Sequence, residues 1–264
     1  MENAVGRFTG KAEIYQKYRP DYAAACLDYL AHRLGWTAGK TIADIGAGTG
    51  IFTRQLLERG LRVEAVEPNA NMLAALRSSC REGKALEIRE GTAARTGLPD
   101  ASVDGAAAAQ AFHWFDADAF RDECRRILRP GGYAALIWNT REAGHPLTEE
   151  AAALCTAYCP GFTGFSGGEA FREEKISLFF GGIFKKRSFD HPIPMNRQAF
   201  IGRYLSASYA PGPADAAYRP FIRALEGLFS AYAQAAPGRG EAEILFPNRT
   251  CCYVGHPAGP KGQR

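Results

Sequence analysis

The 264-residue sequence lacks the segments by which a chain enters or crosses a membrane. No stretch approaches the ~18 consecutive apolar residues that a transmembrane helix needs, and the first twenty residues, MENAVGRFTGKAEIYQKYRP, contain no apolar core of a signal peptide. The seven cysteines are odd in number and scattered, without the spacing of zinc ligands. We therefore expect a cytoplasmic protein with no membrane anchor and no bound metal, whose cysteines are buried or free thiols.

Several signatures of nucleotide and nucleic-acid binding are missing as well. In DIGAGTG, residues 44–50, the third glycine of a dinucleotide fingerprint would fall at position 51, which is Ile51. No Gly-Lys-Ser/Thr follows, which excludes a Walker loop. The net charge is only +4, and most basic residues are interleaved with acids. The dense basic and aromatic stripe of a nucleic-acid binder is therefore absent, and the basic clusters at 125–129 and 185–187 are better explained as solvated faces.

Alternating strand-like and helix-like patterns fill the first half of the chain. Phe120, Cys124 and Ile127 fall on one helical face, with Asp116 or Asp118 as N-cap. The turn Pro130-Gly131-Gly132 is expected to end that helix. Short apolar runs predict strands at 41–46, 62–66, 85–89, 103–109 and 133–138. This alternation predicts an α/β fold with a doubly wound, mostly parallel sheet and helices on both faces.

The second half of the chain, after residue 141, loses this regular alternation. Helical stretches are predicted near residues 147–158, 169–179, 197–208 and 213–235. Segments 183–190 and 246–254 are strand-like, and we expect them to join the sheet, one of them antiparallel. We expect a single domain over 1–264 with its core at about 37–140 and a helical cover over the ligand edge made of 8–34, 141–180 and 192–245.

The stretch with the most chemical information runs from the first strand to the second. Gly46, Gly48 and Gly50 follow the first strand, and Glu67 ends the second. A glycine-rich turn lets the backbone approach a ligand closely and directs helix N-terminal amides at it. A carboxylate at the end of the second strand, such as that of Glu67, can accept hydrogen bonds from both hydroxyls of a ribose. Together these residues predict a nucleoside site, although Glu67 alone could be an acid at a helix N-terminus.

Five segments occur in the order found in a known family. IADIGAGTG, VEAVEPN, GTAARTGLPDASVD, AQAFHW and RPGGYAALIWN resemble the class I S-adenosylmethionine-dependent methyltransferases. The likeness is strongest to the small-molecule branch that contains the ubiquinone/menaquinone and trans-aconitate enzymes, and YQKYRPDY is similar to their opening segment. It covers about residues 8–140. It implies a Rossmann-like fold with a helical lid, S-adenosyl-L-methionine as cofactor and S-adenosyl-L-homocysteine as product.

The resemblance also implies a set of site residues. Its cofactor-binding positions are Asp44, Gly46, Ala47, Gly48, Gly50, Glu67, Pro68, Thr92, Ala93, Gln110, Ala111, Tyr18 and Arg19. Many members carry aspartate where this chain has Thr92, whose hydroxyl is a weaker acceptor and which can also be a turn residue. Tyr15, Trp114 and Asn139 are expected at the substrate pocket. Each of three residues has an alternative role outside the site. Trp114 can be a buried packing residue, Asn139 a turn residue and Arg19 an ordinary surface arginine.

The chemistry of a sulfonium needs few catalytic groups. Its methyl group is already activated, so the protein mainly aligns the acceptor and excludes water. A general base is needed only when the acceptor must lose a proton. His113 is the candidate base, or a hydrogen-bond partner of an anionic acceptor; it can equally line the pocket or cap the next helix.

Four functions compete for this sequence. We expect a methyltransferase that acts on a small molecule, because the Asp/Asn-Pro-Pro-aromatic and Pro-Cys motifs of nucleic-acid enzymes are absent. An NAD(P)-dependent oxidoreductase is the first alternative, and Ile51 counts against it. A non-catalytic S-adenosylmethionine-binding module is the second. An RNA methyltransferase, suggested only by the basic isoelectric point, is the third.

Overall fold

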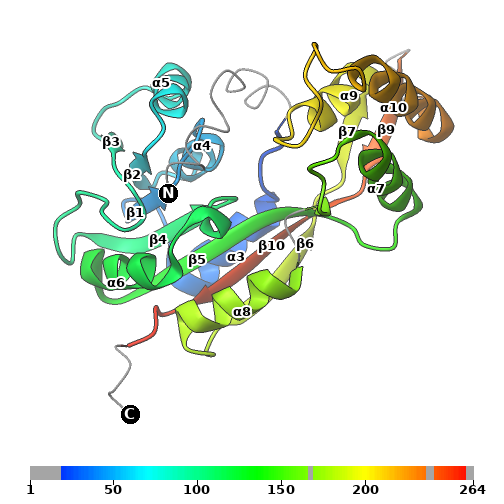
Figure 1. Ribbon diagram of the computed structural model, residues 1–264. Coiled ribbons are helices and arrows are strands. Elements are labelled where there is room, and N and C mark those ends of the chain that lie inside the picture. Colours follow the sequence, from blue (N-terminus) through cyan, green and yellow to red (C-terminus); the bar gives the residue numbers. More distant parts are fainter. Residues whose placement is uncertain (1–18, 166–168, 236–240, 260–264) are drawn as a thin grey trace.

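The computed structural model describes residues 19–165, 169–235 and 241–259 of the chain. A seven-stranded sheet in the order β3-β2-β1-β4-β5-β10-β6 forms its centre (Figure 1). The strands are β1 (Thr41–Ile45), β2 (Arg62–Glu67), β3 (Leu86–Glu90), β4 (Val103–Ala109), β5 (Leu128–Arg141), β6 (Lys185–Asp190) and β10 (Asn248–Gly255). The first five strands are parallel, and β10 runs antiparallel to both β5 and β6. The predicted sheet, mostly parallel with one late antiparallel strand, is confirmed.

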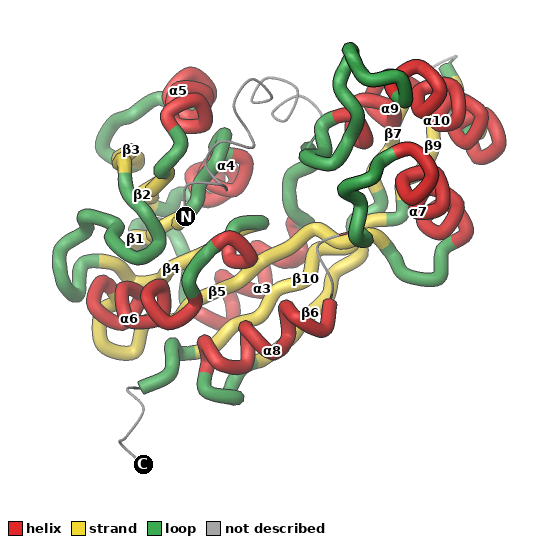
Figure 2. The backbone as a smooth tube through the Cα atoms, viewed as in Figure 1, coloured by secondary structure: helices red, strands yellow, loops and turns green. Residues whose placement is uncertain are grey.

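Helices cover both faces of this sheet, as Figure 2 shows. Neighbouring residues of a strand point to opposite faces, so Ile42 packs in one core cluster and Ala43 in the other. One face carries α3 (Ala24–Leu34), α4 (Ile51–Glu58) and α5 (Ala70–Ser79), and the other carries α6 (Ala117–Ile127) and α8 (Glu169–Phe180). The apolar strands and amphipathic helices of the sequence therefore meet in two cores separated by the sheet.

Two helices belong to a different layer from the one expected. The sequence placed α3 in the cover, within 8–34, but its Cys26, Leu27 and Leu30 pack in the core cluster of the first sheet face. The sequence placed α8 in the cover, within 141–180. In the structure Ile176 and Phe179 are fully buried in the core cluster of the second sheet face, where Phe179 stacks on Phe120 of α6. The prediction failed because periodicity identifies an amphipathic helix without identifying the surface on which its apolar side packs.

A second group of elements lies at the far end of β5 and β10 (Figure 1). We call it the cover; it consists of α7 (Pro146–Tyr158), α9 (Arg197–Leu205), α10 (Tyr218–Tyr232) and the small antiparallel sheet β7 (Ile193–Asn196), β9 (Ala242–Phe246), β8 (Gln234–Ala235). Phe200, Tyr204 and Phe221 are fully buried in a core cluster of its own. The assignment of the whole chain to one domain stays a prediction.

The small sheet corrects the prediction of one strand over 246–254. β9 ends at Phe246 and β10 begins at Asn248, with Pro247 between them. Proline has no N–H to donate to a ladder, which suits a junction between two sheets. Strands of two to five residues carry too little pattern to be recognised in a sequence.

The ends of the helices agree only in part with the caps and terminators predicted from the sequence. Asp116 caps α6, its Oδ1 accepting from the N–H of Ala119 at 3.0 Å. The expected terminator Pro130-Gly131-Gly132 instead lies inside β5, because the helix already ends at Ile127. Two other helices begin later than predicted: α3 starts at Ala24, and α10 at Tyr218, after a run of turns. Of the segment 8–34, which the sequence assigned to the helical cover, residues 8–18 lie outside the described residues.

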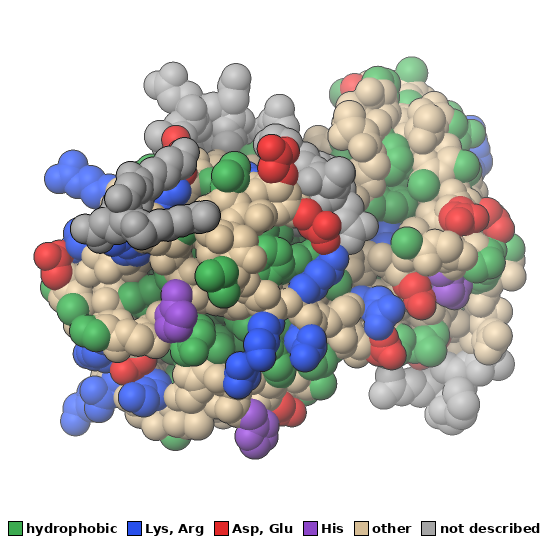
Figure 3. Space-filling model, turned by 90° about the horizontal axis from the view of Figure 1, so that it is seen from below, with side chains coloured by type: hydrophobic (Ala, Val, Ile, Leu, Met, Phe, Trp, Pro, Cys, Tyr) green, Lys and Arg blue, Asp and Glu red, His purple; other side chains and the backbone are tan. Residues whose placement is uncertain are grey.

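Some features that the sequence suggested can be checked on the described part of the chain. No helix there is long and apolar enough to cross a membrane, and no group of three or more His, Cys, Asp or Glu side chains could hold a metal ion. All seven cysteines are free thiols, and only Cys251 is not buried. On the face shown in Figure 3, lysine and arginine side chains gather in several groups among acidic and apolar ones.

Candidate active site at the glycine loop

The glycine turn after β1 has a conformation that only small residues adopt easily. Gly46 has a φ of +71°, and a Cβ placed on it would lie 2.7 Å from Cβ of Ala111. Gly48 has a φ of +59°, but a Cβ on it would meet no atom within 4 Å. Gly46 is therefore required by packing against the end of β4, whereas Gly48 borders open space.

Glu67, the last residue of β2, binds this turn from the neighbouring strand. Its Oε2 accepts from the N–H of Gly48 and its Oε1 accepts from the N–H of Asn69, each at 2.9 Å. The side chain is buried, and burial raises the pKa of its carboxyl group. A carboxylate has about four acceptor positions, so two hydrogen bonds leave capacity for a ligand.

Asp44 of β1 is buried beneath the turn with one oxygen unsatisfied. Its Oδ2 accepts from the hydroxyl of Thr53 at 2.6 Å, while its Oδ1 is buried without a hydrogen-bond partner. Burial is the main cause that raises the pKa of Asp44 to about 7, and the nearby charge of Glu67 adds to it. The hydroxyl of Thr49 is also buried without a partner. Buried polar atoms are usually paired, so these two mark a place where a polar ligand fits.

Gln110 follows β4 with a strained backbone. Its φ is +54°, which non-glycine residues rarely adopt. Its N–H donates to the carbonyl of Ile137, and its Nε2 donates to the carbonyl of Asn139, each at 2.8 Å. Strain of this kind persists only where the surroundings hold it, and it is common at functional sites.

These residues line one cavity at the carboxyl ends of β1, β2 and β4, where open α/β sheets bind ligands. Its volume of about 140 Å³ is less than the ~300–1,000 Å³ usual for ligand pockets, so a nucleoside would also occupy the open space in front of it. The predicted residues that line it are Asp44, Gly46, Ala47, Gly48, Glu67, Pro68, Gln110, Ala111 and Trp114.

Other predicted residues do not line this cavity. Gly50, Thr92, Ala93, Arg19, His113 and Asn139 lie outside its lining, and Tyr15 and Tyr18 lie outside the described residues. At Gly50 a Cβ would lie 2.5 Å from Leu76, so that glycine serves the packing of α4 on α5. Thr92 forms an isolated β-bridge with Arg95, as a turn residue does.

His113 and Asn139 have structural contacts of their own. Nε1 of Trp138 lies 3.4 Å from Nδ1 of His113. Nδ2 of Asn139 donates to the carbonyl of Asp21 at 2.7 Å, and its Oδ1 accepts from Thr250 at 2.6 Å. Asn139 therefore joins the segment before α3 to β5 and β10.

Several lining residues were not predicted. Tyr22, Thr49, Ile51, Phe52, Asn69, Met72, Ala109 and Phe115 also line the cavity. Thr49 lies within the motif IADIGAGTG and Asn69 within VEAVEPN, so both could have been predicted from the sequence. Asn69 caps α5, its Oδ1 accepting from the N–H of Asn71 and of Met72, which explains the turn after Glu67. The apolar members carry no signal that separates them from core residues.

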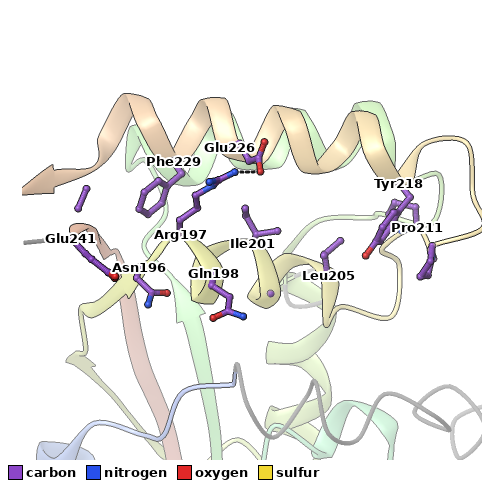
Figure 4. A pocket seen from close by; sticks show the side chains of 14 residues that line it. Asn196, Arg197, Gln198, Ile201, Leu205, Pro211, Tyr218, Glu226, Phe229 and Glu241 are labelled. Carbon is purple, nitrogen blue, oxygen red and sulfur yellow. Dashed lines mark hydrogen bonds and ion pairs between the residues drawn. The ribbon is translucent and has the colours of Figure 1, made fainter.

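A larger, more open cavity of about 910 Å³ lies in the cover, between α9 and α10 (Figure 4). Arg197 and Glu226, which face each other across it, form an ion pair. The charges of these two lining residues are thus satisfied by each other. The glycine-loop cavity, with its unpaired Asp44 oxygen, is the stronger candidate for chemistry.

Comparison with known proteins agrees with this geometry. A family model described as a methyltransferase domain matches residues 43–136, from β1 into β5. Residues 43–136 therefore form a methyltransferase domain. The matched region contains the glycine turn, Glu67 and Gln110, all of which line the cavity.

Relatives described as methyltransferases match about half of the chain. An uncharacterised methyltransferase of Mycobacterium bovis is 43% identical over 128 residues, 48% of this chain and 50% of the relative. One of Schizosaccharomyces pombe is 34% identical over 158 residues, 57% of this chain and 59% of the relative. The chain thus spans about half the length of the curated relatives it matches.

Solved structures share the fold over most of the chain. The YcgJ protein of Bacillus subtilis aligns over 89% of this chain and all of its own, with 16% identity and a TM-score of 0.55. The [4+2]-cyclase SpnF aligns over 89% of this chain and 82% of its own, with 19% identity and a TM-score of 0.50. At this identity the likeness concerns the fold alone, and the cyclase's name illustrates that one fold can serve different reactions.

Proposed function

We propose that the chain transfers a methyl group from S-adenosylmethionine to a small-molecule acceptor. The observation that carries this proposal is the unpaired, buried Oδ1 of Asp44, in a residue that lines the glycine-loop cavity. An unpaired carboxylate oxygen in the interior is costly. The ammonium group of a methionine moiety would supply both the missing donor and the opposite charge.

The rest of the cofactor has matching residues around the same cavity. Glu67 has acceptor capacity for the two hydroxyls of a ribose, and Gly48 leaves room for the sugar to approach. Ile51 and Met72 line the cavity beside Glu67 and offer apolar surface for adenine. We propose these two in place of Thr92 and Ala93, which do not line it.

The protein's part in the reaction would be alignment and the exclusion of water. Bound S-adenosylmethionine supplies a methyl group on a sulfonium and a neutral leaving group. The aromatic side chains of Tyr22, Trp114 and Phe115 line the cavity and shield it from solvent. Gln110 is fixed by the carbonyls of Ile137 and Asn139, and so can hold an acceptor in a defined orientation.

His113 is a poor general base in its present contact. If Nε1–H of Trp138 donates to Nδ1, the neutral imidazole carries its proton on Nε2 and offers a donor there. We therefore do not assign His113 the role of a general base. A small-molecule acceptor, the absence of a nucleic-acid partner and a cytoplasmic location all remain predictions.

The test is calorimetric titration of the chain with S-adenosylmethionine, S-adenosylhomocysteine, NAD and NADP. We expect micromolar binding of the first two and a loss of about 100-fold in Glu67→Ala, because hydrogen bonds to charged groups are the strong ones. Glu64→Ala is the matched control: it lies on the same strand but pairs with Arg89 and does not line the cavity. Preferred binding of NAD(P) would refute the proposal. Cofactor binding without product in an acceptor screen would favour a non-catalytic module.

A further inference from the structure

Two arginines from distant parts of the chain meet on one aromatic ring in the cover. Arg141 ends β5, and Arg203 lies on α9 with only 5% of its surface exposed. The guanidinium carbon of Arg141 is 5.6 Å from the ring centre of Phe246, and that of Arg203 is 4.8 Å from it. Arg141 also stacks on Phe165, at 3.6 Å. The two positive charges are therefore held near each other by aromatic packing.

Hydrogen-bond donors of both guanidinium groups are unsatisfied. Nε and Nη1 of Arg203 and Nε of Arg141 are buried without a hydrogen-bond partner. Nη2 of Arg203 makes a long contact, 3.4 Å, to Oδ1 of Asn248. In the alternative amide orientation, Asn248 accepts from the N–H of Arg249 instead, and Arg203 loses that acceptor as well.

Several other arginines of the described chain have a counter-charge that this pair lacks. Arg59, Arg89 and Arg126 each form an ion pair with a carboxylate. Burial lowers the pKa of Arg203, and the neighbouring charges of Arg141 and Arg19 lower it further. A guanidinium nevertheless stays protonated in proteins. A buried, uncompensated positive charge weakens a fold, so its presence points to an anion from outside the chain.

The position of the pair relates it to the glycine-loop cavity. The arginine pair and the cavity both lie at the carboxyl edge of the sheet. β4 ends beside the cavity at Ala109, and Ala109 pairs with Ile137 of β5. Arg141 is four residues farther along β5, about 13 Å at ~3.3 Å per residue. Between them, the carbonyl of Asn139 accepts from the side chain of Gln110, which lines the cavity. An acceptor of ordinary metabolite size could span this distance.

We propose that Arg141 and Arg203 bind an oxyanion, a carboxylate or phosphate group, of the methyl acceptor. The planar guanidinium fork matches both groups with paired hydrogen bonds. The identification of the bound molecule as the acceptor rests on the proposed function. The existence of an anion site rests only on the arginines.

Calorimetry with two probes, inorganic phosphate and succinate, tests the anion site. Each is titrated into the full chain at constant ionic strength, with and without S-adenosylhomocysteine. We expect one of them to bind and Arg203→Gln to weaken it at least tenfold. The probe that binds more tightly shows whether the oxyanion is a phosphate group or a carboxylate group. Arg197→Gln is the control, because Arg197 lies on the same helix but is exposed and paired with Glu226. Absence of binding, or equal binding by wild type and Arg203→Gln, would overturn the proposal.

A second variant separates a binding role from a structural one. If Arg203 is retained for an anion, Arg203→Met removes an unpaired buried charge, and its Tm should equal or exceed that of the wild type. A Tm several degrees lower, with the oxyanion bound as before, would mean that the arginine serves packing. S-adenosylhomocysteine titrated into the same variants distinguishes the two proposals. If S-adenosylhomocysteine binds but neither oxyanion does, the anion site is refuted and the proposed function stands. If an oxyanion binds but S-adenosylhomocysteine does not, the proposed function is refuted and the anion site stands.

Discussion

The glycine-loop cavity and the cover each contain a buried charged side chain with an unsatisfied polar atom, and the two charges have opposite signs. Asp44 has an unpaired oxygen at the end of β1, and Arg203 has two unpaired nitrogens on α9. Asp44 belongs to a motif in which a few adjacent residues make the site. Arg203 meets Arg141 only because β5, α9 and β9 come together in space. The comparison teaches that the glycine turn around Asp44 can be recognised in a short stretch of sequence, whereas the pair of arginines is assembled only by the fold.

The largest effect on stability is expected from a substitution that weakens the core of the cover alone. Phe200 is fully buried in the core of the cover, so Phe200→Ala should cost about 3–5 kcal/mol of the local free energy of unfolding. Hydrogen exchange should then speed up in α7, α9 and α10 and stay slow in β1 and β4. Leu245→Ala, at a side chain 65% exposed, is the control. Equal acceleration in the sheet would show that the two regions unfold as one unit.

Two glycines of the same turn should separate stability from binding. Gly46→Ala should cost about 2–3 kcal/mol of stability, because its Cβ would lie 2.7 Å from that of Ala111 at a positive φ. Gly48→Ala meets no atom within 4 Å, so it should cost only the ~1–2 kcal/mol of the left-handed conformation while obstructing the cavity. Chemical denaturation and titration with S-adenosylhomocysteine measure the two effects. Unimpaired binding by Gly48→Ala would place the cofactor elsewhere.

A smaller loss is expected at the junction of the two regions. Asn139→Ala removes the hydrogen bonds to Asp21 and Thr250 and leaves buried groups unsatisfied, which should cost about 1–3 kcal/mol. Its effect on cofactor affinity should be slight, because Asn139 does not line the cavity. Thermal unfolding and calorimetry of the same preparation check both parts. A large loss of affinity would instead mean that Asn139 contacts the ligand.

The smallest change per step, at most about 1.4 kcal/mol for each pH unit, is a pH dependence that Asp44 confers. Its pKa is raised from 3.8 to about 7, so between these values the folded state holds a proton that the unfolded state has lost. Stability should therefore fall as pH rises through this window, relative to Asp44→Asn. Binding of S-adenosylhomocysteine should change in the opposite direction and strengthen up to about tenfold per pH unit between 6 and 7, because the carboxylate must be ionised to pair with an ammonium group. A pH-independent affinity would contradict the role given to Asp44.

Particular residues show why some predictions succeeded. The sheet followed from short apolar runs, because most residues of a strand that is buried on both faces are apolar. The turn at Gly46 and the acid at Glu67 have fixed places at strand ends, so their convergence on one cavity could be foreseen.

Other residues could not be placed from sequence for equally physical reasons. Whether α8 packs on the sheet or in the cover depends on the shape of surfaces far away in the chain. Phe115 and Met72 look like core residues until the cavity that they line is known. Arg141 and Arg203, 62 positions apart, are ordinary surface arginines by pattern, and what marks them is that each has a buried guanidinium nitrogen without a hydrogen-bond partner.

The central claim is that the two unsatisfied charges mark the two ends of one reaction site. Crystals grown with S-adenosylhomocysteine and selenate would test it through anomalous scattering. We predict the sulfur of the cofactor product in the glycine-loop cavity and a selenium peak between Arg141 and Arg203. Selenate confined to exposed arginines such as Arg197, with the glycine-loop cavity empty, would contradict the account.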